Sequence, residues 1–384
     1  MKIISQQVIK ITKDENEIQK DMLKESEIPK ILESKVSQKG TGIIEAYGAN
    51  THQGLVRDYN EDRVSIILNI VRPPNKTHIK DWPACSFFAV YDGHGGAACA
   101  DFLRDNLHQF IVKDEMFPQD PVQSIKNGFA KAEKFCLEKA EYTGMMDKSG
   151  SCAIVAFLIE NKCYIANVGD SRAILSSQLG KKVNDLSTDH KPSIESEQQR
   201  IKSLGGRIYQ TEIPLPSYMI QPGKPNTIKG PHRVHPGRLA VSRTFGDPES
   251  KLPRYGGIPG VISSEPEIFQ FDINEQQDDF ILLGCDGIFD TLDSEQTIKI
   301  IWEQKQKIIQ QIQKTQQLSP YLKRKQMNNQ ENNNKFLNQF VGLSINHLLK
   351  TCLLRKSFDN VTVLLIAFPN LAKFFSLQNS THLD

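Results

Sequence analysis

Four acidic motifs in this chain each border a short apolar run rich in Val, Ile and Phe. Two motifs follow such a run, YDGHGG after FFAV and CDGIFD after FILLG, and two precede one, NED before RVSIIL and FDN before VTVLLIAF. Runs of this length and composition predict buried β-strands. In an antiparallel sheet the end of one strand lies beside the start of its neighbour. If these strands are neighbours that alternate in direction, all four motifs meet on one rim.

Acidic side chains gathered at one rim need neutralising cations, because two carboxylates about 4 Å apart near a protein surface repel by roughly 4 kcal/mol. Hard oxygen ligands without thiolates favour Mg²⁺ or Mn²⁺ over Zn²⁺ or Cu²⁺. The glycines that follow Asp92 also allow a main-chain carbonyl to face a metal. One Asp-Gly pair alone is typical of a plain β-turn, but the whole set at strand ends favours a metal site. Its candidate ligands are Glu61, Asp62, Asp92, Asp286 and Asp359.

Two further polar residues accompany these motifs. Arg57 lies four residues before Glu61. Its guanidinium suits either an ion pair with a carboxylate or bidentate binding of a phosphate. Considered alone, the two interpretations are evenly balanced. His94 alone would more often be a hydrogen-bonded turn residue than a catalyst. Beside Asp92, however, it is well placed to deliver a proton near neutral pH.

The pattern of apolar segments predicts an α+β protein. Strand candidates occupy residues 64–70, 86–91, 152–160, 163–168, 172–177, 280–285 and 361–368. A short connection at Asn161-Lys162 predicts a hairpin, and therefore mainly antiparallel sheets. Helical periodicity occurs at residues 97–111, 121–140, 193–206 and 293–311. The last of these opens with Asp293 and Gln296 at the spacing of a capping box. Together they predict a central β-sandwich of two sheets flanked by α-helices on both sides, in α-β-β-α layers.

Composition limits the class of protein and its partners. The formal net charge of +2 gives no strong attraction to nucleic acid or anionic membranes. No apolar stretch reaches the ~18 residues that a membrane span needs, and the first residues lack a signal-peptide core. Seven scattered cysteines without a CxxC pair predict neither a disulfide framework nor a zinc site. We expect a monomer in the cytoplasm, with the nucleus left open because KRK at 323–325 is short for an import signal.

Several segments depart from the strand pattern. Residues 1–45 are polar and predict an N-terminal extension, and residues 370–384 predict a C-terminal tail, on either side of a domain at 46–369. The Gln- and Asn-rich residues 303–335 predict a helix extension that runs into a disordered insertion, with an interaction site as the alternative. The Pro-rich residues 209–236 predict a long surface excursion of the kind that covers or lines a site.

Along the chain the motifs follow one another in a specific order: RDYNED, FFAVYDGHGG, SGSCAIVAFL, YIANVGDSRAIL, STDHKP, QQRIKSLGG, RLAVSRTFGD, SSEPEI, ILLGCDGIFD and DNVTVLLIAF. This ordered set resembles the metal-dependent serine/threonine protein phosphatases of type 2C over nearly the whole of the expected domain. The resemblance implies a β-sandwich flanked by helices and a centre with two Mg²⁺ or Mn²⁺ ions. It also implies hydrolysis of phosphoserine and phosphothreonine monoesters on phosphoproteins by a water that the metals activate.

The resemblance further implies roles for individual residues. The metals would be held, directly or through bound water, by Glu61, Asp62, Asp92, Asp286 and Asp359. Asp92 would bridge the two ions, and the carbonyl of Gly93 would add a ligand. Arg57 would bind the substrate phosphate, and His94 would act as the general acid. Asp170 would help to hold a weaker third metal, although a hydrogen-bonding turn residue between two strands is the alternative for this position.

Other residues in the motifs are expected to be architectural. Cys152 stands where the family usually has Thr, and neither Cys152 nor Cys285 belongs to a CxxxxxR phosphate cradle, so both are expected to pack in the core. Arg243 and Asp247 are expected in a buried polar network more than in catalysis. The excursion at 209–236 takes the place of the family's variable flap, where substrate preference would reside.

Two rival functions stay open. A non-catalytic phosphatase-like scaffold would bind phosphoproteins without turnover, and it would normally have lost some of the metal-binding acids, whereas none is missing here. A two-metal hydrolase of another phosphoester, such as a nuclease, is disfavoured by the near-neutral charge and by the lack of a basic, aromatic-interleaved stripe.

Overall fold

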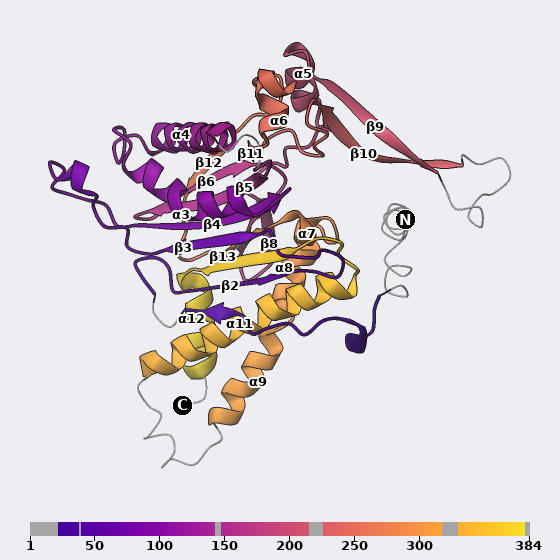
Figure 1. Cartoon of the computed structure of the whole chain (residues 1–384). Coiled ribbons are helices and arrows are strands. Elements are labelled where there is room, and N and C mark those ends of the chain that lie inside the picture. The colour runs from indigo at the N-terminus through magenta and orange to yellow at the C-terminus, as the bar shows by residue number, and fades with distance from the viewer. Residues whose placement is uncertain (1–21, 38–39, 143–146, 215–225, 317–328, 381–384) are drawn as a thin grey trace.

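Two antiparallel β-sheets packed face to face form the centre of the molecule (Figure 1). The computed structural model describes residues 22–37, 40–142, 147–214, 226–316 and 329–380. The first sheet has the strand order β1 (Lys35–Val36), β2 (Ala46–His52), β14 (Val361–Ala367), β13 (Asp278–Gly284), β7 (Arg172–Ser177) and β8 (Lys182–Asp185). The second has the order β12 (Glu267–Asp272), β6 (Lys162–Val168), β5 (Gly150–Ile159), β4 (Cys85–His94) and β3 (Arg63–Ile67), with β11 (Phe245–Gly246) paired to β5.

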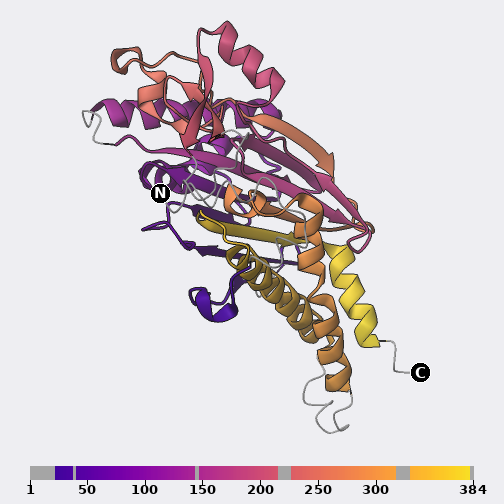
Figure 2. The same ribbon diagram turned by 90° about the vertical axis from the view of Figure 1, so that its right-hand side faces the viewer.

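Helices cover the outer face of each sheet, as Figures 1 and 2 both show. Over the second sheet lie α3 (Ala98–Val112) and α4 (Pro121–Tyr142), and over the first lie α8 (Ser294–Trp302), α9 (Lys305–Gln316), α11 (Asn329–Leu354) and α12 (Pro369–Ser380). The predicted α-β-β-α sandwich is therefore confirmed. The predicted cap is also present, since the Asp293 side chain accepts a hydrogen bond from the Gln296 N–H at 2.7 Å at the start of α8.

Alternation along β4 shows why these apolar runs form a sandwich. Phe87 and Ala89 pack in the core beneath α3 and α4, whereas Phe88 and Val90 pack in the core between the two sheets. Successive side chains of a strand point to opposite faces, so a strand that is buried on both faces reads as a continuous apolar run. Full burial of one such Phe or Val side chain contributes roughly 1.5–3 kcal/mol.

The hairpin between β5 and β6 differs by one residue from the expected turn. Ile159 pairs with Lys162, so the turn residues are Glu160 and Asn161 where Asn161-Lys162 was predicted. Glu160 has φ 51°, which is the left-handed backbone that a two-residue hairpin turn requires at its first position. Lys162 is therefore the first residue of β6, and the antiparallel pairing of the two strands is as predicted.

The acidic motifs reach one rim from two sheets. In the second sheet β3 begins just after Asp62 and pairs antiparallel with β4, which ends in Asp92–His94, with Arg63 opposite Tyr91. In the first sheet β13 ends just before Asp286 and pairs antiparallel with β14, which begins just after Asp359. Each sheet thus contributes two motifs, and the packing of the sheets brings the four together.

Both ends of the expected domain continue into the folded body. Lys35 and Val36 pair with β2, and Ile31 packs against the core that lies under α11. Near the C-terminus, Leu371 and Phe375 of α12 are fully buried in that core. The expected extension and tail therefore include packed residues, while positions 1–21 and 381–384 lie outside the described residues.

The expected insertion and excursion are partly described. α9 and α11 flank residues 317–328, which lie outside the described part of the chain, so the prediction of disorder there is not addressed. Strands β9 (Arg207–Pro214) and β10 (Thr227–His235) form a separate antiparallel hairpin that projects from the body beside α5 (Glu195–Ser203) in Figure 1, with a register shift between Lys229 and His232.

Within the described residues, no helix is both long enough and apolar enough to cross a membrane.

Short helices complete the loops: η1 (Glu25–Glu27), η2 (Pro74–Lys76), α6 (Pro248–Lys251), η4 (Pro253–Tyr255) and α7 (Asp286–Phe289). Of these, α7 begins at the rim itself, because its first residue is the aspartate of the CDG motif. The loop before α6 carries Asp247, which also reaches the rim.

Candidate metal centre and active site

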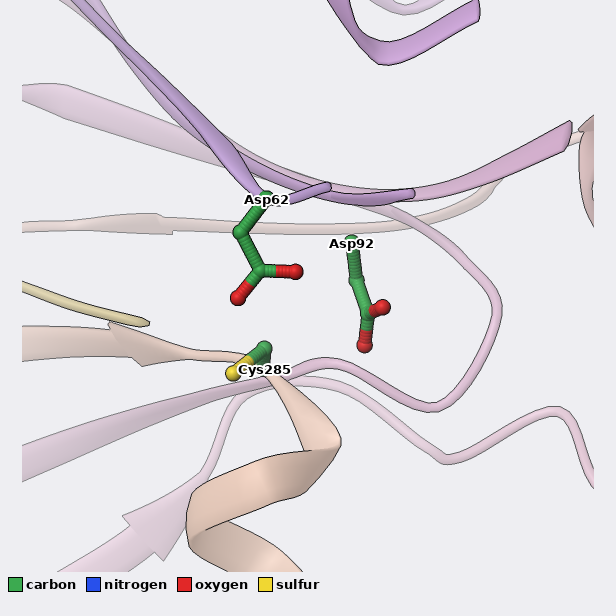
Figure 3. A group of neighbouring side chains, drawn as sticks. All are labelled: Asp62, Asp92 and Cys285. Carbon is green, nitrogen blue, oxygen red and sulfur yellow. The ribbon is translucent and has the colours of Figure 1, made fainter. Parts of the chain in front are cut away.

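Two overlapping groups of acidic side chains lie at the rim. In the first, one carboxylate oxygen each of Asp62 and Asp92 and the Cys285 sulfur lie within 4.8 Å of one another. Figure 3 shows the carboxylates of Asp62, just before β3, and Asp92, in β4, extending toward Cys285 at the start of α7. In the second, oxygens of Asp92, Asp170 and Asp286 lie within 4.8 Å of one another. Asp92 belongs to both groups, so they form one continuous cluster.

Asp62 and Asp170 are buried, Asp92 and Asp286 are partly buried, and the four carboxylates repel each other. Burial, reinforced by the charge of Asp62, raises the pKa of Asp92 well above its usual range. Burial and the charge of Asp92 do the same to the pKa of Asp286. Burial likewise raises the pKa of Asp62, and it raises that of Asp170 in spite of the nearby Lys191 ammonium. Full ionisation of the cluster is therefore unfavourable until a cation enters it.

The donor atoms available at the cluster fit a hard divalent cation. Asp286 Oδ1 is buried and has no hydrogen-bond partner among the described residues, and such an oxygen is costly unless an ion or water meets it. Cys285 Sγ donates a hydrogen bond to the Asn360 carbonyl at 3.4 Å and accepts one from the Thr362 N–H at 3.1 Å, so the backbone already engages this sulfur. The other donor atoms of the two groups are carboxylate oxygens, which suit Mg²⁺ or Mn²⁺.

Glu61 lies beside the cluster but outside both groups. Its side chain is buried, and Oε1 accepts a hydrogen bond from the Gly96 N–H in the HGG turn. The side chain of Asn360 holds the Glu61 segment in place, because its Oδ1 accepts from the Glu61 N–H at 2.8 Å and its Nδ2 donates to the Gln53 carbonyl at 2.7 Å. The FDN motif contained this signal, but sequence reasoning gave a role to its aspartate alone.

Gly93 lies where two backbones approach closely. A Cβ added at this position would lie 2.5 Å from the Glu61 carbonyl oxygen and 3.2 Å from the Ala100 Cβ. A side chain at residue 93 would therefore push β4 away from the segment that carries Glu61 and Asp62. The glycine is needed for this contact whether or not its own carbonyl binds a metal.

Asp359 forms an ion pair with Arg57, and it too lies outside the two groups. Arg57 Nη2 donates to Asp359 Oδ2. Burial opposes the charge of Arg57, but Asp359 and the more distant Asp286 and Glu61 outweigh it and raise the pKa of the guanidinium. The Arg57 side chain is 45% exposed, so it can contact a ligand from solvent as well as Asp359. Both interpretations of Arg57 from the sequence are therefore compatible with its position.

His94 has a partner that sequence reasoning placed in a structural network. Its Nε2 lies 3.0 and 2.9 Å from the two carboxylate oxygens of Asp247, and Thr244 Oγ1 donates to the same carboxylate at 2.6 Å. Burial opposes protonation of His94, but Asp247 outweighs it and raises the pKa of the imidazole. A Cβ added at Gly150 would lie 2.1 Å from Asp247 Oδ2 and 2.5 Å from His94 Nε2, so the glycine leaves room for this pair.

Three residues near Asp170 were not expected at the site. Lys191, from the STDHKP motif, places its Nζ 3.6 Å from Asp170 Oδ2 and 3.5 Å from Asp290 Oδ1. Asp290 is the second acid of CDGIFD, four positions after Asp286, and that helical spacing was the available signal. Cys152 donates to Asp170 Oδ1 with an S–O distance of 3.7 Å, so it touches the site as well as packing in the core.

Fold and site together define an α-β-β-α sandwich with a buried oxygen-ligand centre at one rim, and comparisons with known proteins agree. A family described as "Protein phosphatase 2C" matches residues 56–334. The chain therefore belongs to the protein phosphatase 2C family, which confirms the resemblance that the ordered motifs indicated.

Individual relatives extend this result. The chain is 35% identical over 215 residues to "Probable protein phosphatase 2C 27" of Arabidopsis thaliana, covering 56% of this chain and 49% of the relative. It is 29% identical over 354 residues to human "Protein phosphatase 1A", covering 90% and 76%. The chain thus spans about half the length of the Arabidopsis relative.

Solved structures share the fold. A serine-threonine phosphatase 2C from Toxoplasma gondii superposes with a TM-score of 0.53 at 18% identity, covering 89% of this chain and 98% of that one. A C. elegans sex determining protein superposes with a TM-score of 0.58 at 20% identity, covering 91% of this chain and 68% of that one. At these identities the likeness supports the fold alone.

Proposed function

We propose that this protein hydrolyses phosphoserine and phosphothreonine monoesters on proteins with the help of two divalent ions, Mg²⁺ or Mn²⁺. The observation that carries the proposal is the cluster of four carboxylates, Asp62, Asp92, Asp170 and Asp286, which two overlapping groups form by sharing Asp92. Membership of the protein phosphatase 2C family supports the reaction and the substrate class.

In this proposal the acids of the rim hold the ions directly or through water. Asp62, Asp92 and Asp286 would be the central ligands, while Glu61 and Asp359 lie at the edges of the cluster. Bound ions would supply Lewis-acid stabilisation of the phosphate and an activated water. Asp170 would help to hold a weaker third ion. The Lys191 ammonium, 3.6 Å from Asp170 Oδ2, would compete with that ion for the carboxylate.

Arg57 and His94 would act on the substrate itself. Arg57 is half-exposed and its planar guanidinium can hold two phosphate oxygens at once. His94 would donate a proton to the seryl or threonyl oxygen as it leaves, so that a bare alkoxide is not released. Asp247 supports this role in two ways, because it orients the imidazole and favours its protonated form.

We also propose that the protein is a monomer and that it acts in the cytoplasm, with the nucleus as the second compartment.

The test is hydrolysis of a phosphothreonine peptide by the purified chain, with and without Mn²⁺ or Mg²⁺, beside the Asp286→Asn variant. Turnover that requires metal and is lost in the variant is the expected result. A folded protein that shows no turnover with either ion would overturn the proposal in favour of a scaffold that binds phosphoproteins. Salt-dependent affinity for DNA or RNA, measured on the same preparation, would instead favour the nuclease alternative.

A further inference from the structure

Two free cysteines are in contact on the helical layer behind the His94 turn. The sulfurs of Cys99, in the first turn of α3, and Cys136, in α4, lie 3.8 Å apart. The two helices pack side by side over the second sheet (Figure 1). The two thiols are far apart in the sequence, so this contact is made by the fold and was not visible in the spacing of the cysteines.

The contact borders a small cavity on one side. Cys99 is buried with 4% of its surface exposed, whereas Cys136 is partly exposed. A cavity of about 10 Å³, roughly the space of one water, is lined by both cysteines and by Phe102, Lys139 and Asp147. Lys139 and Asp147 form an ion pair at its edge, with Lys139 Nζ 3.8 Å from Asp147 Oδ2.

Both cysteines are also close to the loop that holds His94. A Cβ added at Gly246 would lie 3.1 Å from the Cys99 sulfur, so Cys99 lies against the residue that precedes Asp247. On the other helix, Glu133 precedes Cys136 by one turn and its Oε2 accepts a hydrogen bond from the Gly246 N–H at 2.9 Å. A change in the distance between α3 and α4 would therefore act on Gly246 from both sides.

We propose that Cys99 and Cys136 are a peroxide-sensitive dithiol that closes to a disulfide. Cys136, the more exposed thiol, attacks hydrogen peroxide. Its sulfur takes one oxygen, the O–O bond breaks, and water leaves. Cys99 then attacks the sulfur of this sulfenic acid, the S–S bond forms, and the hydroxyl leaves with the Cys99 proton as a second water. In sum, two thiols lose two electrons and two protons, peroxide accepts both, and a dithiol reagent reverses the reaction.

The unequal surroundings of the two sulfurs support this order. A hydrogen bond with Cys136, together with burial, holds the pKa of Cys99 well above its usual range, which keeps it a thiol until a partner sulfur is activated. Closure requires the sulfurs to approach from their present contact to bonding distance, which changes the packing of Cys99 against Gly246. We expect the Asp247–His94 pair to be displaced as a result. This consequence rests on the proposed function, whereas formation of the disulfide does not.

The experiment uses the full chain, reduced, freed of metal and then exposed to hydrogen peroxide. Remaining thiols are alkylated, and the protein is digested without reduction for peptide mass mapping. We expect a linked pair of peptides containing Cys99 and Cys136, an intact mass lower by two hydrogen atoms, and full reversal by a dithiol reagent. Cys136→Ser and Cys99→Ala should both abolish the link. The matched control Cys163→Ala, a lone buried thiol of β6, should keep it.

Activity on a phosphothreonine peptide is then measured after metal is restored. Oxidised wild type should lose kcat by about tenfold, because a displaced general acid forfeits part of a contribution of about 10²–10⁴, while peroxide-treated Cys136→Ser should keep its kcat. Absence of the linked peptides, or oxygen added to Cys152 or Cys285 in their place, would overturn the dithiol. A disulfide that leaves kcat unchanged would overturn its connection to His94. Inactivity of the reduced protein would count against the proposed function alone.

Discussion

Two regions of this molecule that hold buried carboxylates differ in what neutralises those carboxylates. At the rim, Asp92 and Asp286 face other carboxylates, and their pKa values are held well above the usual range. In α5, Glu197 is buried too, but its two oxygens accept hydrogen bonds from Arg243 at 2.7 Å and Arg200 at 2.8 Å. Burial alone would raise the pKa of Glu197, yet the two arginines outweigh it and lower the value to about 2.

The contrast separates a structural acid from a functional one. Burial of a charge is tolerated when the protein itself supplies the opposite charge and the hydrogen bonds, as it does for Glu197. The rim has Arg57 and Lys191 at its edges and no cation of the protein at its centre among the described residues. Perturbed acids without an internal partner are typical of functional sites, so the rim is arranged for an ion that comes from solution.

The largest effect is expected from Asp92→Asn. Loss of the shared ligand should lower kcat/KM for a phosphothreonine peptide by about 10³-fold or more, since metal-based activation and charge stabilisation both depend on it. The same change removes one charge from a repelling cluster. The metal-free variant should therefore be at least as stable toward urea as the metal-free wild type. Activity assays and urea titrations in a chelator measure the two outcomes.

A variant that retains activity would show that Asp92 is not a metal ligand. A metal-free variant that unfolds at clearly lower urea than wild type would show that Asp92 stabilises the fold in the way Glu197 does, and the comparison would fail. Mn²⁺ provides the control, because it should raise the unfolding midpoint of wild type by binding the native state and should have a much smaller effect on Asp92→Asn.

The matched change in the other region is Glu197→Gln, and its effect should have the opposite sign. Removing this carboxylate leaves Arg200 and Arg243 without their partner in a largely buried setting. A broken buried pair costs about 3–5 kcal/mol, and because both arginines are partly exposed we expect about 3 kcal/mol of lost stability, measured by urea unfolding. The kcat of the folded variant should be close to wild type. A stability as high as that of wild type would refute the structural role of Glu197.

The fold and the identity of the rim acids were accessible from sequence because they depend on local pattern. Runs such as FFAVY are apolar at every position, which indicates strands buried on both faces, and the acidic motifs mark where those strands begin or end. Antiparallel pairing then places Asp62 beside Asp92 and Asp286 beside Asp359. What the pattern could not supply was the division of these pairs between two sheets, because face-to-face packing has no signature in strand order.

Contacts between distant loops were beyond the sequence for the same reason. The approach of Asp247 to His94 depends on a loop that follows the hairpin of β9 and β10, more than 150 positions along the chain. Lys191 meets Asp170 and Asp290 in the same way. Asn360 supports Glu61 through its side-chain amide, although the motif showed only that an amide follows the acid. Such hydrogen bonds depend on loop geometry, which residue types alone do not determine.

A smaller effect, on pH dependence, is expected from His190, which lies in the same polar region as Glu197. Burial, with the charge of Arg243, lowers the pKa of His190 to about 4 from an ordinary 6.5. The folded protein thus keeps a neutral imidazole where the unfolded chain binds a proton. Its contribution to stability is present above pH 6.5 and is lost as the pH falls toward 4. Between about pH 8 and about pH 5 this amounts to about 2 kcal/mol.

Comparison with His190→Gln isolates this contribution. Gln can still accept the hydrogen bond that the Gly169 N–H donates to His190 Nδ1 at 3.1 Å, but it does not titrate. The difference in unfolding free energy between wild type and variant should therefore shrink or reverse as the pH is lowered, by about 2 kcal/mol over that interval. Parallel curves for the two proteins would show that His190 is already able to take up a proton in the folded state.

The smallest effect concerns Arg57, which contacts the rim acid Asp359 and is also exposed to solvent. Arg57→Lys keeps a positive charge for Asp359 but removes the planar fork that holds two phosphate oxygens. If Arg57 binds substrate, KM for a phosphothreonine peptide should rise about tenfold, or about 1.4 kcal/mol, with an unfolding free energy within about 1 kcal/mol of wild type because exposed ion pairs contribute little. If Arg57 serves only as the ion-pair partner of Asp359, KM should stay unchanged in Arg57→Lys, and Arg57→Ala should lower the unfolding free energy without changing KM. The first outcome would show that Arg57, like the rim acids, has a partner that comes from solution. The second would show that Arg57, like Glu197, has only a structural partner within the protein.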